Sequence, residues 1–356
     1  MLLTLYFLGG NTGVGKETAL QLALHGATVI IGCRNPIKGA AAVTSLHKEL
    51  LTADKTFFPL ACAGTVEYMP LDLSCFFSVK AFASEYLAKF SHLDILINNG
   101  GLNLKSVNKN GLQELFMVNY LSHYLLFRLL EPALSATSTS NKSPDSDCTS
   151  IPQEARVVNL SSVMHHEGNS EFEKSAFTKY TPGEPFSYYS DSKLYLNYLT
   201  MEINRRHAVS CAEGGQQRRV SAISVNPGAV RSDIWRHVPR LISYPYDIFM
   251  RIYFLSVQQG AAPSLFAATA PLLPPSSALC THSPLLPYVV PYRVYGNILA
   301  FEMMGPFGGA GWALPSEPPQ AEEKAHELYN FSEQLINSLV ESEQDPQFVE
   351  QKFRLA

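Results

Sequence analysis

The sequence has no excess of positive charge and no closely spaced cysteines. Its 27 lysine and arginine residues are outnumbered by 31 aspartate and glutamate residues, which leaves a formal net charge of −4. Binding to the phosphate backbone of nucleic acid needs a dense basic surface, so we expect no nucleic-acid partner. The closest of the six cysteines are Cys62 and Cys75, and no Cys-x-x-Cys pair exists. We therefore expect reduced thiols and no bound metal.

Uninterrupted apolar runs of membrane-spanning length are also missing. Residues 1–8 are apolar, but they are too short for a signal peptide or a spanning helix and lack a basic region. Residues 252–292 contain no Asp, Glu, Lys or Arg, yet seven prolines interrupt them, which excludes a single spanning helix. We expect a cytoplasmic protein without a transmembrane anchor, and we leave open a peripheral contact with an intracellular membrane.

The sequence does contain enough apolar material for a core, because 46% of its residues are hydrophobic and 16% are charged. Through the first two thirds, β-branched apolar runs alternate with runs of helical spacing. Strands are expected at 2–8, 27–32, 68–71, 93–98, 156–160 and 220–225, and helices at 16–25, 37–51, 78–90, 111–134 and 189–207. This alternation predicts an α/β fold, a doubly wound parallel sheet with helices on both faces.

We expect one large domain with a C-terminal extension. Residues 1–270 would form the main domain, with residues 135–152, rich in Ser, Thr, Asn and Asp, as a surface loop insertion. Residues 271–356 would pack on the same domain. They begin with a stretch rich in proline, glycine and aromatic residues that shows no clear period, and a helix is expected at about 321–341.

A glycine-rich turn, Gly9-Gly10-Asn11-Thr12-Gly13-Val14-Gly15, joins the first expected strand to the first helix. Glycines let a backbone approach a pyrophosphate, and the amino end of a helix presents free N–H groups to it. Glycine-rich turns also occur for packing alone, so the pattern by itself does not establish that the turn binds a phosphate. Residues 10–16 also match the start of a P-loop, but Glu17 stands where that motif needs a hydroxyl for Mg²⁺.

The end of the second strand bears on the choice of nucleotide. An acidic residue near this point would bind an adenosine ribose, and the sequence has Cys33-Arg34 instead. A guanidinium suits a 2′-phosphate by charge and geometry, which favours NADP over NAD. The alternative is that Arg34 is simply exposed at a strand end.

Tyr189 and Lys193 lie four positions apart on an expected helix, and therefore on one face of it. A nearby ammonium stabilises phenolate, so we expect Lys193 to lower the pKa of Tyr189 and to suit it for proton transfer. Most Tyr/Lys pairs at this spacing are surface contacts. Small and amide residues at the ends of other strands, in 98–101, 159–162 and 227–228, favour a cofactor crevice, because ligands bind at the carboxyl ends of parallel strands.

Together these motifs resemble the short-chain dehydrogenase/reductase family, and most of all its retinol-dehydrogenase-like branch. The resemblance implies a Rossmann-type fold and NADP(H) as cofactor, with NAD(H) the less favoured alternative. The matching motifs, in family order, are Gly9-x-x-x-Gly13-x-Gly15, Cys33-Arg34-Asn35, Asp72-Leu73-Ser74, Asn98-Asn99-Gly100-Gly101, Val118-Asn119-Tyr120, Asn159-Leu160-Ser161-Ser162, Tyr189-x-x-x-Lys193 and Pro227-Gly228-Ala229-Val230-Arg231-Ser232.

The resemblance implies a role for each matched position. Tyr189 would be the general acid/base, and Lys193 would bind the nicotinamide ribose and keep Tyr189 acidic. Ser162, rather than Ser161, would hydrogen-bond the substrate oxygen, and Asn119 would hold a helix kink and a water leading to the lysine. The cofactor would contact Gly9, Asn11, Thr12, Gly13, Val14, Gly15, Arg34, Asp72, Leu73, Asn99, Gly100, Tyr189, Lys193, Pro227, Gly228, Val230 and Ser232.

The sequence departs from the family pattern at a few positions. Leu8 stands where a threonine is usual, Gly100 where alanine is usual, and Ser232 where threonine is commoner. His165-His166 follows the serine motif as in the retinol-dehydrogenase-like branch, and we expect a loop role for the pair rather than metal binding.

The resemblance implies an NADP(H)-dependent oxidoreductase that interconverts a carbonyl and an alcohol. Aromatic and apolar residues after the later strands suggest a lipophilic substrate such as a retinoid, steroid or fatty aldehyde, although they could equally form core or a homo-oligomer interface. The alternative function is a catalytically silent, nucleotide-bound scaffold of the same fold. An acyl-transfer pair, Ser190-x-x-Lys193, lacks its partner motifs. The substrate-side candidates are Tyr244, Tyr246, Phe249, Tyr253, Phe254, Tyr288, Phe301, Met303, Met304 and Phe307.

Overall fold

The structure is a computed structural model that describes residues 4–8, 10–53, 64–103, 106, 112–136, 154–170, 187–212, 219–231, 254–270, 287–291, 310–313 and 320–343. Its strands are β1 (Thr4–Leu8), β2 (Thr28–Cys33), β3 (Thr65–Pro70), β4 (Ile95–Asn98), β5 (Ala155–Leu160), β6 (Val220–Val225), β7 (Tyr288–Pro291) and β8 (Ala310–Ala313). Its helices and turns are α1 (Gly13–Leu24), α2 (Pro36–Thr52), α3 (Phe76–Lys89), α4 (Glu114–Phe116), η2 (Met117–Leu121), α5 (Ser122–Ser135), η3 (Val163–Glu167), α6 (Ser187–Ala212), α8 (Val257–Thr269) and α11 (Ala321–Glu343).

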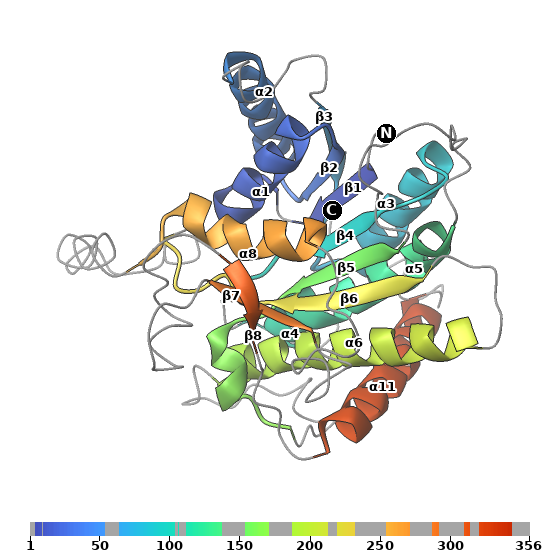
Figure 1. Cartoon of the computed structure of the whole chain (residues 1–356). Helices are drawn as coiled ribbons and strands as arrows, with labels where there is room; N and C mark the ends of the chain where they lie inside the picture. Colours follow the sequence, from blue (N-terminus) through green and yellow to red (C-terminus); the bar gives the residue numbers. More distant parts are fainter. Residues whose placement is uncertain are drawn as a thin grey trace.

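The strands form one sheet in the order β3-β2-β1-β4-β5-β6-β7-β8. All neighbouring pairs are parallel except β7 with β8, which is antiparallel. The chain runs outward from β1 to β3 and then returns to the other side of β1 with β4 (Figure 1). This reversal beside β1 is the topological switch point at which such sheets bind ligands. The Rossmann-type doubly wound sheet is therefore confirmed, with an antiparallel edge strand added.

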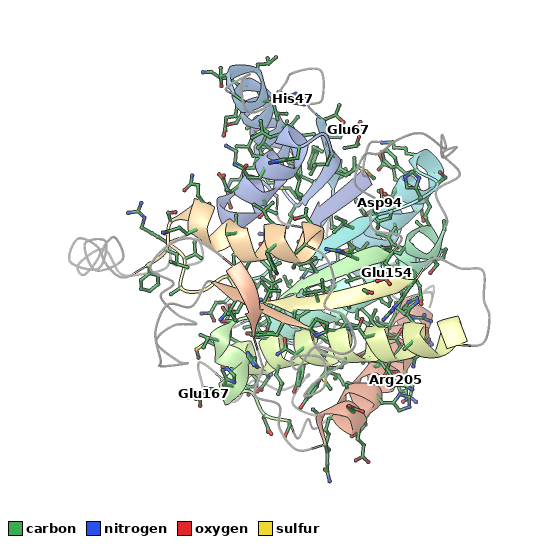
Figure 2. The ribbon with its side chains drawn as sticks, in the orientation of Figure 1. His47, Glu67, Asp94, Glu154, Glu167 and Arg205 are labelled. Carbon is green, nitrogen blue, oxygen red and sulfur yellow. The ribbon has the colours of Figure 1, made fainter. Side chains whose placement is uncertain are left out.

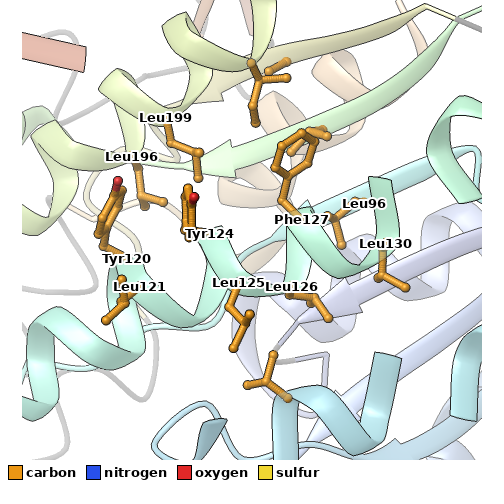
Figure 3. Close-up of a cluster of buried hydrophobic side chains, with 14 of the residues drawn as sticks. Leu96, Tyr120, Leu121, Tyr124, Leu125, Leu126, Phe127, Leu130, Leu196 and Leu199 are labelled. Carbon is orange, nitrogen blue, oxygen red and sulfur yellow. The ribbon is translucent and has the colours of Figure 1, made fainter. Parts of the chain in front are cut away.

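Helices cover both faces of the sheet because alternate strand residues point to opposite sides. One buried cluster contains Val157 and the apolar sides of α3, α5, α6 and α11, and the other contains Val158 and the apolar sides of α1, α2 and α8. Figure 1 shows the two helix layers with the strands between them. Figure 3 shows part of the first cluster, where Tyr120 and Tyr124 lie near Leu196 and Leu199 of α6.

Several elements differ from the sequence expectation. The helix expected at 111–134 is interrupted by η2, a π-helical turn that contains Asn119. The short strands β7 and β8 lie in the proline-rich stretch after residue 270, which showed no clear period, and α8 lies just before that stretch, where no element was expected. A capping box between Ser256 and Gln259 starts α8, and this is the local signal that could have predicted it. The expected insertion at 135–152 falls, apart from its first two residues, outside the described residues.

Among the helices in the described ranges, none combines the length and the apolar character that crossing a bilayer requires.

Candidate functional site

The glycine turn enters α1 with backbone geometry that suits an anion. Gly13 has φ 56°, a left-handed conformation that glycine adopts without strain. Thr12 precedes the helix with no side-chain cap, and the first turn of α1 holds no acidic residue. The N–H groups at this helix end therefore face no competing carboxylate, which fits a pyrophosphate. Gly9, the first glycine of the motif, lies outside the described residues.

The P-loop alternative places Lys16 on the phosphates, and the structure places it elsewhere. Lys16 Nζ donates to Glu49 Oε1 at 2.8 Å and to Ser45 Oγ at 2.9 Å, both on α2. The ammonium holds the pKa of Glu49 below its usual range. A lysine engaged with a neighbouring helix is not available to the glycine turn.

Arg34 follows the end of β2, at the same edge of the sheet as the glycine turn that follows β1. The two ends are level because Leu8 of β1 pairs with Gly32 of β2. Its side chain is exposed, and it makes no ion pair with any residue of the described ranges. The next residue, Asn35, accepts a hydrogen bond from Lys38 N at 3.0 Å and caps α2. The guanidinium is therefore open to a ligand beside the amino ends of two helices.

Amide side chains join the ends of the central strands. Asn98 Nδ2 donates to Asn159 Oδ1 at 2.8 Å, and Asn159 Nδ2 donates to Thr200 Oγ1 on α6 at 2.9 Å. After Asn98, the Gly100 carbonyl is held by the ring of His123, whose Nε2 lies 2.7 Å away. Burial lowers the pKa of His123 to about 4, so this ring is neutral at physiological pH. These bonds fix the turn that contains Asn99 and Gly100.

The turn after β3 is stabilised by its own aspartate. Asp72 Oδ1 accepts hydrogen bonds from Ser74 N at 2.9 Å and from Ser74 Oγ at 2.7 Å. Leu73 lies next to it, and its carbonyl accepts a hydrogen bond from Ser122 Oγ at the start of α5. Asp72 and Leu73, both candidates for cofactor binding, therefore lie on a turn that is hydrogen-bonded to α5.

Tyr189 and Lys193 share the first turns of α6, as their spacing predicted. Lys193 is buried, its Nζ lies 5.5 Å from the centre of the Tyr189 ring, and it donates to the Leu160 carbonyl at 2.7 Å. Ser162, at the end of β5, hydrogen-bonds the Tyr189 hydroxyl. Asn119 is fully buried, and its Nδ2 donates to Ser192 Oγ at 3.1 Å. The four expected catalytic side chains thus come together where β5 meets α6.

The pKa values of this pair differ from the expectation. Burial raises the pKa of Tyr189 to about 12, although the hydrogen bond with Ser162 acts in the opposite direction. Burial also lowers the pKa of Lys193 to about 8. The expected lowering of the tyrosine pKa was wrong, because removal from water has a larger effect than the hydrogen bond with Ser162. At neutral pH the tyrosine is therefore a protonated phenol and the lysine a cation.

The loop after β6 begins at the same edge of the sheet, because β6 runs parallel to β5. Gly228 has φ 78°, and its N–H donates to Asn226 Oδ1 at 2.9 Å, beside Pro227. Val230 is buried and pairs with Leu255 just before α8. Ser232 lies outside the described residues, as do all the substrate-side candidates except Phe254 and Tyr288.

Comparison with known proteins identifies the family. The sequence profile described as short chain dehydrogenase matches residues 4–240. The chain belongs to the short-chain dehydrogenases. It is therefore an oxidoreductase. Human retinol dehydrogenase 12 is 34% identical over 272 residues, which cover 76% of this chain and 74% of that protein.

Two further relatives agree with this assignment. A short-chain dehydrogenase/reductase of Armillaria gallica is 33% identical over 270 residues, covering 74% of this chain and 75% of that protein. A solved structure of a protein from Mycobacterium paratuberculosis, described as uncharacterized, is 26% identical with a TM-score of 0.58, and it covers 94% of this chain and 92% of that one. The similarity to retinol dehydrogenases confirms the retinol-dehydrogenase-like resemblance.

Sequence reasoning did not identify every residue that shapes this short-chain dehydrogenase site. Gly260 on α8 lies against Val230 and Val14, two of the cofactor candidates. A Cβ at Gly260 would overlap Cγ2 of Val230 and lie 3.2 Å from Cγ2 of Val14. The signal was weak, because a glycine inside a proline-containing segment looks like a turn residue.

We expect Gly260→Ala to lower the free energy of unfolding by about 1–3 kcal/mol, because the added methyl overpacks the contact between α8 and the two valines. Glycine to alanine inside a helix otherwise stabilises a protein by about 0.5–1 kcal/mol. Urea denaturation of the variant and the wild type measures the difference, and a gain in stability would show that the close contact is absent.

Proposed function

We propose that this protein is an NADP(H)-dependent oxidoreductase that interconverts a lipophilic carbonyl and its alcohol, with Tyr189 as the general acid/base. The observation that carries the proposal is the grouping of Ser162, Tyr189 and Lys193 at the carboxyl ends of the parallel strands, the same edge of the sheet at which α1 begins. The similarity to retinol dehydrogenases supports an alcohol or carbonyl of retinoid type.

In the direction of reduction, NADPH when bound supplies a hydride to the carbonyl carbon. Tyr189 donates its phenolic proton to the carbonyl oxygen, and Ser162 donates a hydrogen bond to that same oxygen. The ammonium of Lys193 stabilises the phenolate that remains on Tyr189, because it lies over the phenol ring in a buried site. In the direction of oxidation the same transfers would run in reverse: the phenolate of Tyr189 accepts the proton of the alcohol, and NADP⁺ when bound would take the hydride from the carbinol carbon.

We propose that Arg34 selects NADPH by binding its 2′-phosphate. Arg34→Ala should weaken NADPH binding about 10- to 100-fold and leave NADH binding unchanged, because only NADPH carries this phosphate. Fluorescence titration with both nucleotides measures the two dissociation constants. Lys48→Ala, which removes an exposed charge further along α2, is the matched control. An equal loss for both nucleotides, or none for NADPH, would contradict this assignment.

The proposed reaction is tested by following NADPH oxidation with retinaldehyde, a steroid ketone, a long-chain aldehyde and a short polar aldehyde. We expect turnover with at least one lipophilic compound, at a higher kcat/KM than with the short polar aldehyde. Tight NADPH binding without turnover of any carbonyl would instead favour the catalytically silent scaffold.

A further inference from the structure

The turn that follows Ser162 is closed by a histidine ring. The carbonyl of Ser162 accepts two hydrogen bonds from one residue, from His165 N at 3.1 Å and from His165 Nδ1 at 2.6 Å. The hydroxyl of Ser162 in turn accepts a hydrogen bond from Met164 N at 3.3 Å and caps η3. Two donors on one carbonyl fix the peptide plane, and with it the direction in which the serine side chain leaves the backbone.

The ring of His165 is itself supported by the far end of the sheet. A carbonyl oxygen can only accept, so Nδ1 of His165 carries the hydrogen in the short bond to Ser162. Tyr288 Oη lies 3.3 Å from the same Nδ1, and the two rings lie 5.3 Å apart, with both residues buried. Tyr288 belongs to β7, which pairs with β6 through Ser224. A residue of the C-terminal region thus contacts the histidine ring that holds the serine carbonyl.

The other side of this turn is attached to α6, which carries Tyr189. Asn169 N donates to Asp191 Oδ1 at 2.7 Å. A Cβ at Gly168 would lie 2.8 Å from Cβ of Leu194 and 3.0 Å from the Ser190 carbonyl, so only glycine allows this close contact. Figure 2 shows Glu167 of the same turn beside the amino end of α6. Ser162 and Tyr189 are therefore kept together by contacts on both sides of the turn.

We propose that His165, supported by Tyr288, is a positioning residue that orients the Ser162 hydroxyl toward Tyr189 and the substrate oxygen. This inference rests on the proposed function, since it requires Ser162 to act in the reaction. His165 touches neither substrate nor cofactor in this role and acts only through the serine.

The experiment is a double-mutant cycle between His165 and Ser162, using the carbonyl that the panel identifies. His165→Leu should lower kcat about 10- to 100-fold while the dissociation constant of NADPH stays within about twofold. His165→Asn should restore most of kcat, because its amide N–H can replace Nδ1–H. In the Ser162→Ala background, His165→Leu should lower kcat by less than about twofold, since the serine it orients is gone.

The outcomes distinguish the catalytic role of Ser162 from the positioning role of His165. If Ser162→Ala leaves kcat unchanged, the proposed catalytic role of the serine fails. If Ser162→Ala lowers kcat but His165→Leu lowers it by the same factor with and without Ser162, the positioning role alone is overturned. A general disturbance of the structure would lower kcat by that factor in both backgrounds.

Tyr288→Phe keeps the aromatic ring, and it tests the same cycle if His165→Leu does not fold. It should lower kcat about 2- to 5-fold only when Ser162 is present, and an equal loss without Ser162 would overturn the proposal.

Discussion

Tyr189→Phe should lower kcat about 10²- to 10⁴-fold while NADPH binds as in the wild type. The substitution removes one oxygen and leaves the ring and its packing on α6. Because the pKa of Tyr189 is about 12, the phenol carries its proton at neutral pH and can donate it to a carbonyl oxygen. Steady-state turnover and a parallel NADPH titration measure the two quantities.

The neighbouring tyrosine provides a matched control for this substitution. Tyr188→Phe removes the same atom one position earlier on α6, where the side chain points to a different side of the helix. We expect it to change kcat by less than about threefold. Turnover by Tyr189→Phe within tenfold of the wild type would contradict the role of the phenol as general acid.

Glu202→Gln should have the largest effect on stability. The Glu202 side chain is fully buried on α6, between two arginines of its own helix and His326 of α11. Arg205 Nη2, Arg206 Nε and His326 Nδ1 lie 2.7, 2.7 and 3.0 Å from Glu202 Oε1. Figure 2 shows Arg205 at the end of α6 that lies beside α11. Removing the negative charge would leave these donors facing a neutral amide.

The pH dependence follows from the pKa of this carboxyl. Burial alone would raise it, but the hydrogen bonds from Arg205, His326 and Arg206 outweigh burial and hold the pKa of Glu202 at about 2. The folded-state pKa lies below the unfolded value, so the stabilisation is fully present above about pH 4.5. It is lost as the pH falls toward 2.

We therefore expect Glu202→Gln to lower the free energy of unfolding by about 2–4 kcal/mol at neutral pH, and by progressively less below about pH 4.5. Urea denaturation at several pH values measures this difference. Glu333→Gln is the matched control, because Glu333 is partly exposed and joins α11 to Arg128 at 3.2 Å. Glu333→Gln should lower the free energy of unfolding by about 0–1 kcal/mol. Equal losses for both variants, or a pH-independent loss, would contradict the account.

The alternation of strands and helices was predictable because each element carries its own periodic pattern. The strands β2, β4, β5 and β6 were predictable because they are apolar and buried on both faces. The start of β3 was missed because Thr65 and Glu67 are exposed on an edge strand, where polar residues interrupt the pattern. The strands β7 and β8 were missed because each has four residues and prolines surround them, so their pairing depends on a sheet already formed.

The candidate site was predictable to the extent that its chemistry lies in short motifs. The placement of Tyr189 and Lys193 on one face could be predicted from a single helix. The position of Ser162 could be predicted because it follows the end of a strand, where parallel sheets bind ligands. The contact between His165 and Tyr288 joins residues 123 positions apart, and no local pattern contains it. The raised pKa of Tyr189 was missed for a related reason, since burial by the whole fold determines it.

The central claim is that hydride passes from NADPH to a lipophilic carbonyl while Tyr189 supplies the proton. The most direct test uses NADPH that carries deuterium at both C4 positions, with the product alcohol analysed by mass spectrometry. The account predicts one deuterium on the carbinol carbon with the wild-type protein, and no alcohol above background with Tyr189→Phe. Tight NADPH binding with no deuterated alcohol from any carbonyl of the panel would contradict it.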